Sequence, residues 1–302
     1  MPGHPNSGAH AADIEVAADL TLDLGPSDIT VAALSLDGTA AGTDITIASG
    51  GSRLILQNND NNQFFDWNTS DTEFTMTYEG ANLGRVVMES HGVAGETNTI
   101  SAPVRFRNNG FHEGIDVYGT RSLTLAGPID IDGADVTAPN LGPSARLRSY
   151  LPQGEKVLIT GNINLTDAVD GVNGRLLQLN DYYTSNTLSQ DSVPPRGMIE
   201  VTGVISGLGT LWANWSWDVD GADDNTKDYL HDPAPVPIAT KSTMPTVILR
   251  GNNTFSGDML IGRGNLVVGH NNALGTDTVT QRGPAGNSKE VGYNLISDAD
   301  DR

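Results

Sequence analysis

The sequence of 302 residues contains no cysteine, which excludes disulfide bonds, thiolate metal sites and cysteine nucleophiles. It also lacks any apolar run close to the ~20 residues that a membrane-spanning helix needs. Stretches with apolar residues at positions i, i+3, i+4 and i+7, which would indicate an amphipathic helix, are nearly absent. The chain is therefore not expected to be helical or to span a membrane with a helix.

Basic residues are few, since 17 Lys and Arg stand against 37 Asp and Glu, for a formal net charge of −20. Such a surface repels phosphate backbones and anionic membrane surfaces, so nucleic acid and membranes are not expected partners. The charge keeps an exposed protein soluble, and cation binding is the second interpretation. Residues 1–12 lack the basic and apolar segments of a secretory signal, and we expect them to form a flexible leader.

Period-two alternation of apolar and polar residues, by contrast, runs through the whole chain. Examples are DIEVAADLTLDL at 13–24, EKVLITGNINL at 155–165 and GMIEVTGVISG at 197–207. Val, Ile, Leu and Thr dominate these runs, and Gly, Asn, Asp and Pro separate them. This pattern predicts many short strands joined by turns, and hence an all-β fold.

Four glycines share one sequence frame, in which positions −4 and −2 are apolar each time: Gly127, Gly161, Gly203 and Gly251. Each glycine lies in phase with the apolar residues beside it. A residue without a side chain on an inward face suits a bend at a packed corner or a close approach of two backbones. The uneven spacing of the frame favours a parallel β-helix with variable insertions. A β-sandwich or jelly roll is the alternative.

Three segments interrupt the alternation, at residues 57–74, 137–155 and 213–245. We expect them to project as loops from a single β-solenoid domain over residues 13–280. Residues 281–302 are expected to form a C-terminal cap or linker. Loops on a rigid scaffold are where binding residues concentrate, so function is sought there first.

The stretch 203–280 resembles the autotransporter-associated β-strand repeat of bacterial secreted and surface proteins. The matching residues are Gly251, Asn253, Thr254, Phe255, Gly257, Gly264, Leu266, Val268, Gly269, Asn271, Ala273, Leu274, Gly275, Thr278, Val279 and Thr280. The insertion at 213–245 departs from the family pattern. The resemblance implies a right-handed parallel β-helix exported to the cell exterior. We expect Phe255, Leu260, Leu266 and Val268 to face inward, and the Asn252-Asn253 and Asn271-Asn272 pairs to occupy left-handed corner positions and to stack in ladders.

Aromatic residues gather in and beside the third insertion, namely Trp212, Trp215, Trp217 and Tyr229. Aromatic faces stack on sugars and anchor protein interfaces, so this cluster is a candidate binding surface for a glycan or a partner. The alternative is that these side chains cover the core of the solenoid itself.

The same insertion places four carboxylates around a glycine, at Asp218, Asp220, Asp223 and Asp224. Ca²⁺ prefers six to eight oxygen ligands, often around a tight glycine turn, so calcium is possible here. The stretch DIDGADV at 130–136 is a shorter version. Neither contains a complete calcium-binding loop, and an acidic turn is the alternative. No other cofactor is expected.

Nothing in the sequence forms a recognisable catalytic group. The outward-facing carboxylates on predicted strands, Asp116, Asp130, Asp132 and Glu200, are expected on a solvated face. The histidines His91, His112, His231 and His270 share no metal-ligand spacing and are expected on the surface.

We therefore expect a non-enzymatic, extracellular structural or adhesive β-solenoid, which self-associates into fibres or a surface layer. The alternative is a glycan-active or glycan-binding β-helix, such as a tailspike-like depolymerase or lyase. That alternative requires two carboxylates on one face beside aromatic residues.

Overall fold

The computed structural model describes residues 11–57, 64–66, 75–77, 86–108, 114–133, 145–168, 171, 173–183, 197–217, 245–262, 264–281 and 293–297. Within them the chain forms strands and turns and no helix, so no helix of the described part could cross a membrane. The strands build three parallel sheets and one small antiparallel ribbon. The predicted all-β parallel β-helix is confirmed, and the β-sandwich or jelly-roll alternative is wrong.

Nine strands pair in sequence order in the first sheet, which we name sheet A. They are β1 (Ala11–Val16), β4 (Ala33–Gly38), β9 (Val86–His91), β12 (Ile115–Gly119), β15 (Ala145–Ser149), β18 (Leu176–Tyr183), β21 (Thr210–Trp217), β23 (Met259–Ile261) and β25 (Val279–Gln281).

Sheet B also has nine strands, and each follows a strand of sheet A in the chain. They are β2 (Leu20–Asp23), β5 (Ile45–Ala48), β10 (Thr97–Ile100), β13 (Ser122–Leu125), β16 (Lys156–Ile159), β19 (Met198–Val201), β22 (Thr246–Leu249), β24 (Gly264–Val268) and β26 (Tyr293–Ser297).

Sheet C has six strands, which complete the first six coils. They are β3 (Ile29–Val31), β6 (Leu54–Leu56), β11 (Val104–Asn108), β14 (Ile129–Gly133), β17 (Ile163–Asp167) and β20 (Ile205–Ser206). The strands β7 (Phe64–Asp66) and β8 (Thr75–Thr77) pair with each other as the antiparallel ribbon.

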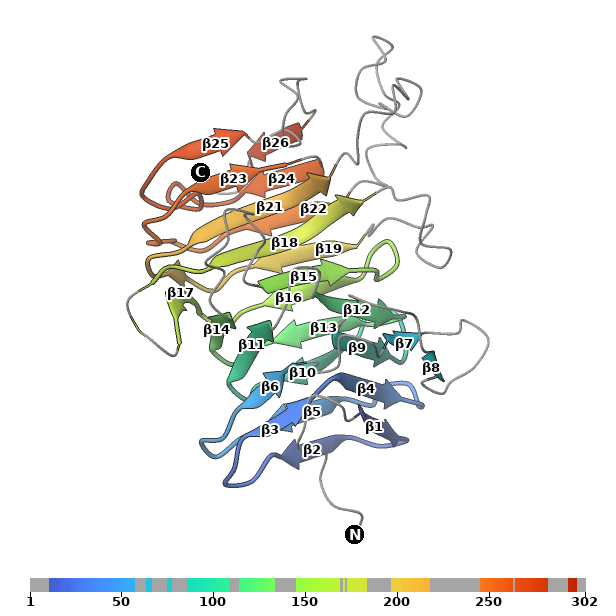
Figure 1. The fold of residues 1–302 in the computed structure, drawn as a ribbon. Helices are drawn as coiled ribbons and strands as arrows, with labels where there is room; N and C mark the ends of the chain where they lie inside the picture. Colours follow the sequence, from blue (N-terminus) through green and yellow to red (C-terminus); the bar gives the residue numbers. More distant parts are fainter. Residues whose placement is uncertain are drawn as a thin grey trace.

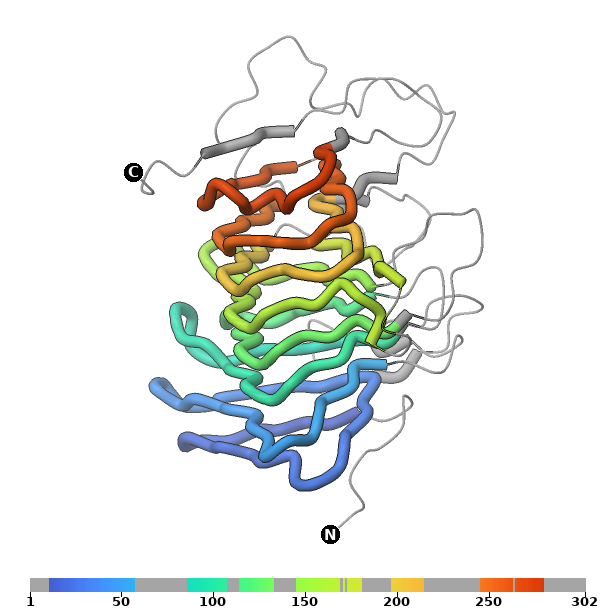
Figure 2. Tube along the Cα trace, turned by 90° about the vertical axis from the view of Figure 1, so that its left-hand side faces the viewer, coloured from blue at the N-terminus to red at the C-terminus, as the bar shows by residue number. Residues whose placement is uncertain are grey.

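Each of the first six coils therefore runs through sheet A, then sheet B, then sheet C, and the next coil lies on top of it (Figure 1). The last three described coils have strands in sheets A and B only. The coils form a single column, from the blue first coil at one end to the red last coils at the other (Figure 2). Alternation of side chains along each strand points one set into the column and the other set outward. We number the coils 1 to 9 by their sheet A strands.

The core is made of vertical rows of apolar side chains, one from each coil. In one row of sheet B every member pairs with the next and none is exposed: Leu123, Val157, Ile199, Val247 and Leu266. Adjacent strands lie about 4.7–4.9 Å apart, so such neighbours are in van der Waals contact. Burying each of these side chains stabilises the fold by about 1.5–3 kcal/mol.

The four framed glycines form a vertical stack at the corner between sheets B and C. A Cβ atom built on Gly161 would lie 1.9 Å from the carbonyl oxygen of Gly127, and one on Gly203 would lie 2.1 Å from that of Gly161. Gly251 repeats the contact above Gly203 at 2.2 Å. The close approach lets one carbonyl serve two donors, since Leu125 accepts from the N–H groups of Thr160 (3.0 Å) and Gly161 (3.1 Å). Only glycine fits these rungs.

Asn253 links three coils from a buried position. Its Oδ1 accepts from the N–H of Ile205 at 2.8 Å, and its Nδ2 donates to the carbonyl of Ala273 at 2.7 Å. Beside it, Nδ2 of Asn272 donates to Oδ1 of Asn252 at 2.8 Å, as the expected ladder requires. These four Asn positions are not left-handed, contrary to expectation. The described non-glycine residues with positive φ are Asn180 (55°) and Asn214 (54°), which lie at the A–B corner.

The repeat-like stretch builds coils 7 to 9. Phe255 and Leu266 are fully buried in the core, while Val268 and Leu274 pack against its margin. Gly264 and Gly275 have positive φ, and a Cβ on Gly275 would lie 2.6 Å from the Phe255 ring, whereas a Cβ on Gly269 would press on the Arg250 side chain. The expectation that Leu260 faces inward is wrong. Its neighbours Met259 and Ile261 enter the core, and Leu260 pairs with Trp212 on the outer face of sheet A.

The boundaries of the expected loops differ from the observed elements. Residues 145–149 of the segment 137–155 form strand β15, and Leu151 is buried, because their apolar residues fill coil 5. Residues 213–217 belong to β21, and β7 lies inside 57–74. Residues 137–144 and 218–244, which make up most of the rest of these two expected loops, lie outside the described residues. At the C-terminal side, β26 pairs with β24, so solenoid pairing continues into residues 281–302.

Replacing Gly161 by Ala should lower the free energy of unfolding by about 1–3 kcal/mol, because its methyl group would collide with the Gly127 carbonyl. Urea unfolding followed by circular dichroism measures the effect. Gly50→Ala is the matched control, since no heavy atom lies within 4 Å of its added Cβ. Equal stability of the two variants would contradict the glycine stack.

Candidate functional site

The outer face of sheet A is the region that the insertions border. In the first six coils sheets B and C are joined by short described connections, such as residues 101–103, 126–128 and 160–162. The internal segments outside the described residues instead lie in the chain between sheets C and A or between sheets A and B, as 134–144 and 218–244 do. Sheet A is therefore where the body of the solenoid and its added segments meet along the sequence.

A row of polar and aromatic residues crosses this face from coil 1 to coil 4. Asp13 pairs with Ser35, Ser35 with Glu89, and Glu89 with Tyr118, one residue from each successive strand. These residues alternate with core residues such as Leu34 and Met88, so they point away from the core. The alternation thus places two carboxylates, Asp13 and Glu89, on one face with a serine between them.

Glu89 is a buried carboxyl on this face whose pKa is raised. It is 4% exposed, and its Oε1 has no hydrogen-bond partner among the described residues. Its Oε2 lies 3.7 Å from Nε2 of His91, which follows on the same strand. Burial raises the pKa of the Glu89 carboxyl and Asp13 adds to the rise, although His91 and Ser35 oppose it. A raised pKa on one carboxyl beside a second is a property of general acids and of pH-sensitive contacts alike.

Two tyrosines and an ion pair continue the face above Glu89. The rings of Tyr118 and Tyr150 stack with centroids 4.6 Å apart and an interplanar angle of 11°. Arg148 makes a bidentate ion pair with Asp116, in which Nε donates to Oδ1 at 2.5 Å and Nη2 donates to Oδ2 at 2.8 Å. The guanidinium carbon of Arg148 lies 6.0 Å from the centre of the Tyr150 ring. Asp116 is fully buried, so the expectation that it lies on a solvated face is wrong. Its paired arginine is what allows a charge to be buried there.

The candidate aromatic cluster is only partly described. Trp212 is buried on the outer face of sheet A between Gln178 and Leu260 and is not an open aromatic surface. Trp215 and Trp217 lie on the same strand, opposite Asp181 and Tyr183. Tyr229 lies outside the described residues. The glycan- or partner-binding role of the cluster stays a prediction.

The calcium candidates Asp218, Asp220, Asp223 and Asp224 also lie outside the described residues. In the shorter acidic stretch, Oδ2 of Asp132 accepts from Nε of Arg107 at 2.7 Å. Asp132 is 8% exposed, so the expectation that it lies on a solvated face is wrong. In the part of the chain that the structure describes, no three His, Asp or Glu residues come together as metal ligands. Residues 134–136 of the shorter stretch lie outside the described residues as well, and calcium binding at either stretch stays a prediction.

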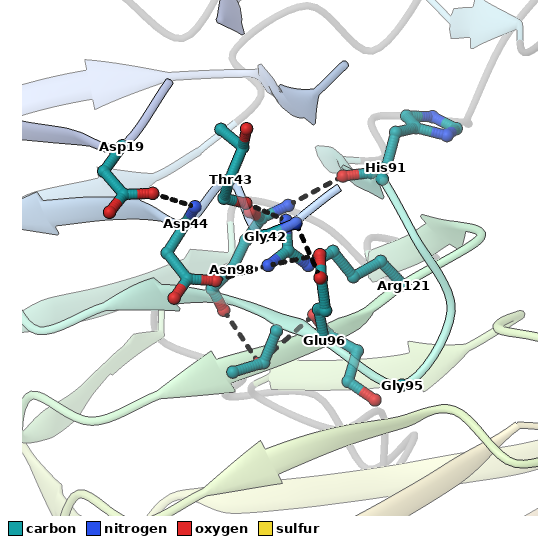
Figure 3. Close-up of polar contacts among 12 residues, drawn as sticks. Asp19, Gly42, Thr43, Asp44, His91, Gly95, Glu96, Asn98 and Arg121 are labelled. Atoms are coloured by element: carbon teal, nitrogen blue, oxygen red, sulfur yellow. Dashed lines mark hydrogen bonds and ion pairs between the residues drawn. The ribbon is translucent and has the colours of Figure 1, made fainter. Parts of the chain in front are cut away.

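A buried arginine joins three coils at the corner between sheets A and B (Figure 3). Arg121 of coil 4 is 0% exposed and donates from Nη1 to the carbonyl of Thr43 and from Nη2 to Oδ1 of Asp44, each at 2.5 Å. Oε2 of Glu96, in coil 3, lies 3.3 Å from the same Nη2. The side chain passes Gly38 and Gly92, where a Cβ would lie 2.9 Å from it. The sequence shows no period that would reveal this residue.

Further carboxylates at this corner hold backbone N–H groups of other coils. Oε1 of Glu96 accepts from Gly42, one coil below, and Oε1 of Glu155 accepts from Gly95, two coils below, each at 2.8 Å. Oε2 of Glu155 takes the N–H and hydroxyl of Ser122 at 2.9 and 2.6 Å. Some of the many acidic side chains therefore hold the turns of different coils together.

On the outer face of sheet B, Glu200 bridges two basic residues of neighbouring coils. Its Oε2 lies 2.5 Å from Nζ of Lys156 and its Oε1 lies 2.7 Å from Nε of Arg250. Burial pushes the pKa of the carboxyl upward, but the hydrogen bonds from Lys156 and Arg250 outweigh it, so the pKa is lowered. Glu200 faces away from the core, but it is 7% exposed and paired with both basic residues, so the expectation that it lies on a solvated face is wrong.

Comparison with known proteins found no matching family model, no matching curated protein and no matching solved structure. The resemblance to the autotransporter-associated repeat therefore stays a prediction from the residues.

Arg121→Met should lower the free energy of unfolding by about 1–3 kcal/mol, because it leaves the Thr43 carbonyl without its donor and Glu96 without its counter-charge, whereas Asp44 is exposed to water. The variant keeps the apolar stem, so the loss reports the charge. Arg53→Met is the control, since its 3.8 Å pair with Asp28 is 41% exposed on both sides and contributes about 0–1 kcal/mol. Chemical denaturation compares the two variants, and equal losses would refute a special role for Arg121.

The raised pKa of Glu89 predicts a pH dependence of stability. The folded state holds this proton more tightly than the unfolded chain, so the stabilisation is complete below the unfolded pKa and is lost as pH rises through the folded pKa. Glu89→Gln should remove that loss, which melting temperatures measured from acidic to alkaline pH would detect. Glu15→Gln, an exposed acid on β1, should leave the profile unchanged in shape. A Glu89→Gln profile that parallels the wild type would contradict the prediction.

Proposed function

We propose that this chain is a structural and adhesive module of the cell exterior, a continuous column with insertions placed in the chain before and after its sheet A strands. The observation that supports this most is the division of the molecule into two parts with different tasks. One part is the continuous core with its glycine stack, and the other is the set of segments that border sheet A. A scaffold that presents variable segments is a common way of building binding surfaces.

The large negative charge agrees with this role. With a net charge of −20, the molecule stays soluble when exposed and is repelled by phosphate polymers. The absence of cysteine is compatible with an exterior location, because the column is held by continuous backbone pairing and needs no disulfide. The location itself is supported by the repeat-like residues of 251–280.

Protease treatment of intact cells that produce the protein tests the location. We expect proteinase K to destroy the surface-bound fraction while a cytoplasmic marker in the same cells survives. The paired strands of the column should resist cleavage for longest, because backbone that is hydrogen-bonded in a sheet must open before it is cut. A protein that is degraded only after cell lysis would contradict the proposal.

A glycan-active role is the second candidate, and the row on sheet A favours it. Glu89, with its raised pKa, lies two strands from the exposed carboxylate of Asp13 and beside the stacked pair Tyr118–Tyr150. Two carboxyls that straddle a bond, one protonated, are the requirement for glycoside hydrolysis by inversion. Reducing-sugar release from a polysaccharide panel, abolished in Glu89→Gln, would establish this role in place of the first.

A further inference from the structure

The first coil leaves its inner side open. Leu22 pairs with Ile47 and faces inward with it, yet Leu22 is 39% exposed while Ile47 is buried. Ile14, Val16 and Leu24 of the same coil are likewise only partly buried. Among the described residues no strand pairs with the outer edges of β1, β2 and β3. In the described part of the chain, this end therefore presents apolar side chains together with strand edges that no described strand pairs.

The last coils are open in the same way. Val279 pairs with Met259, a core residue, and so faces inward, but it is 47% exposed. Within the described part of the chain, β25 and β26 are the last strands of sheets A and B and pair on one side only. Two of the four most exposed large apolar residues, Leu22 and Val279, are thus inward-facing residues of the two terminal layers.

The two ends are complementary because they are opposite faces of one repeating stack. All pairing in sheets A and B is parallel, so β1 of one molecule can follow β25 of another in the same direction, and β2 can follow β26. The inward phase also agrees, since Ile14 and Leu22 would meet the layer that holds Val279. A second copy continues the ladders of sheets A and B with the geometry of the coils inside the molecule, while β3 meets no sheet C strand, because the described part of sheet C ends at β20.

Charge selects the orientation of the two copies. Coil 1, residues 11–31, contains only acidic charged residues: Asp13, Glu15, Asp19, Asp23 and Asp28. Joining two first coils would bring these carboxylates together, which opposes association. The described residues of the last layer, 276–281 and 293–297, include one acid, Asp277. The top of one copy on the bottom of the next therefore avoids the repulsion.

We infer that copies of this chain associate end to end, with β25 and β26 of one molecule pairing with β1 and β2 of the next. The inference deepens the structural role proposed above and rests on it for its biological meaning. A contact between two different surfaces does not close on itself, so the product is a filament that lengthens with concentration. Each copy carries a net charge of −20, so copies repel one another as a whole, and salt strengthens the association by screening that repulsion.

Two variants of the full chain test the inference: Leu22→Glu blocks the bottom and Val279→Glu blocks the top. Light scattering coupled to size-exclusion chromatography measures mass against concentration, and electron microscopy shows the filaments. The wild type should lengthen with concentration. Each variant alone should remain monomeric, with association weakened by about 100-fold or more, because a charge would face an apolar layer. Mixed together, the two variants should form dimers and no longer species. The unaltered last coil of Leu22→Glu can bind the unaltered first coil of Val279→Glu, and the two remaining ends of the dimer are blocked.

Leu208→Glu is the matched control, because Leu208 is 53% exposed but lies between β20 and β21, inside the stack. It should lengthen as the wild type does, and all variants should keep the wild-type melting temperature. Dimers of Val279→Glu alone would show bottom-to-bottom pairing, and dimers of Leu22→Glu alone would show top-to-top pairing; either overturns the inference. A wild type that stays monomeric at high concentration also overturns it, because its ends are then covered within its own chain. That result leaves the proposed surface role standing, which the protease experiment decides separately.

Discussion

Every position in this column has to be compatible with the same position one coil above and one coil below, at a distance of one strand spacing. The parallel pairing repeats this requirement eight times in each of sheets A and B. Inside the column, apolar rows such as Leu123 to Leu266 satisfy it by contact. At the corner between sheets B and C the backbones come closest, and the requirement is met there by glycine, which has no side chain; this is the glycine stack. Polar corners satisfy it by hydrogen bonds between coils.

The requirement also explains how charge can be buried here. Arg121, Asp116 and Arg148 are almost completely enclosed, and each has an oppositely charged partner on another coil. A buried ion pair of this kind forms only between two particular coils, because shifting one coil past the other would leave a buried charge without its partner. Apolar rungs are more tolerant, since Val, Ile and Leu replace one another along the row from Leu123 to Leu266. The buried ion pairs therefore determine the order in which the coils stack, and the rows of apolar side chains supply most of the stabilisation.

Alternation and the glycine frame were sufficient to predict the parallel β-helix, because both are local consequences of stacking. The inward residues Phe255 and Leu266 followed from the same phase. Leu260 did not, because Met259, Leu260 and Ile261 are all apolar, so alternation alone does not say which of them faces inward. Segment 137–155 was interpreted as a loop because its Pro and Arg residues conceal a strand on which Arg148 faces outward into a buried ion pair with Asp116. Arg121 and Glu89 could not be predicted, since their significance depends on partners 25 or more residues away.

In stacked-repeat proteins each layer usually contacts only its two neighbours, so layers can unfold one at a time from either end. Arg121 breaks this rule in the lower half of the column. It begins in coil 4, reaches past Glu96 of coil 3 and ends on Thr43 and Asp44 of coil 2. Opening any one of these three coils disrupts the bonds of all of them. Fraying that begins at coil 1 therefore meets a block that must open as a unit, and slow amide exchange in β4, β9 and β12 would share a single opening event.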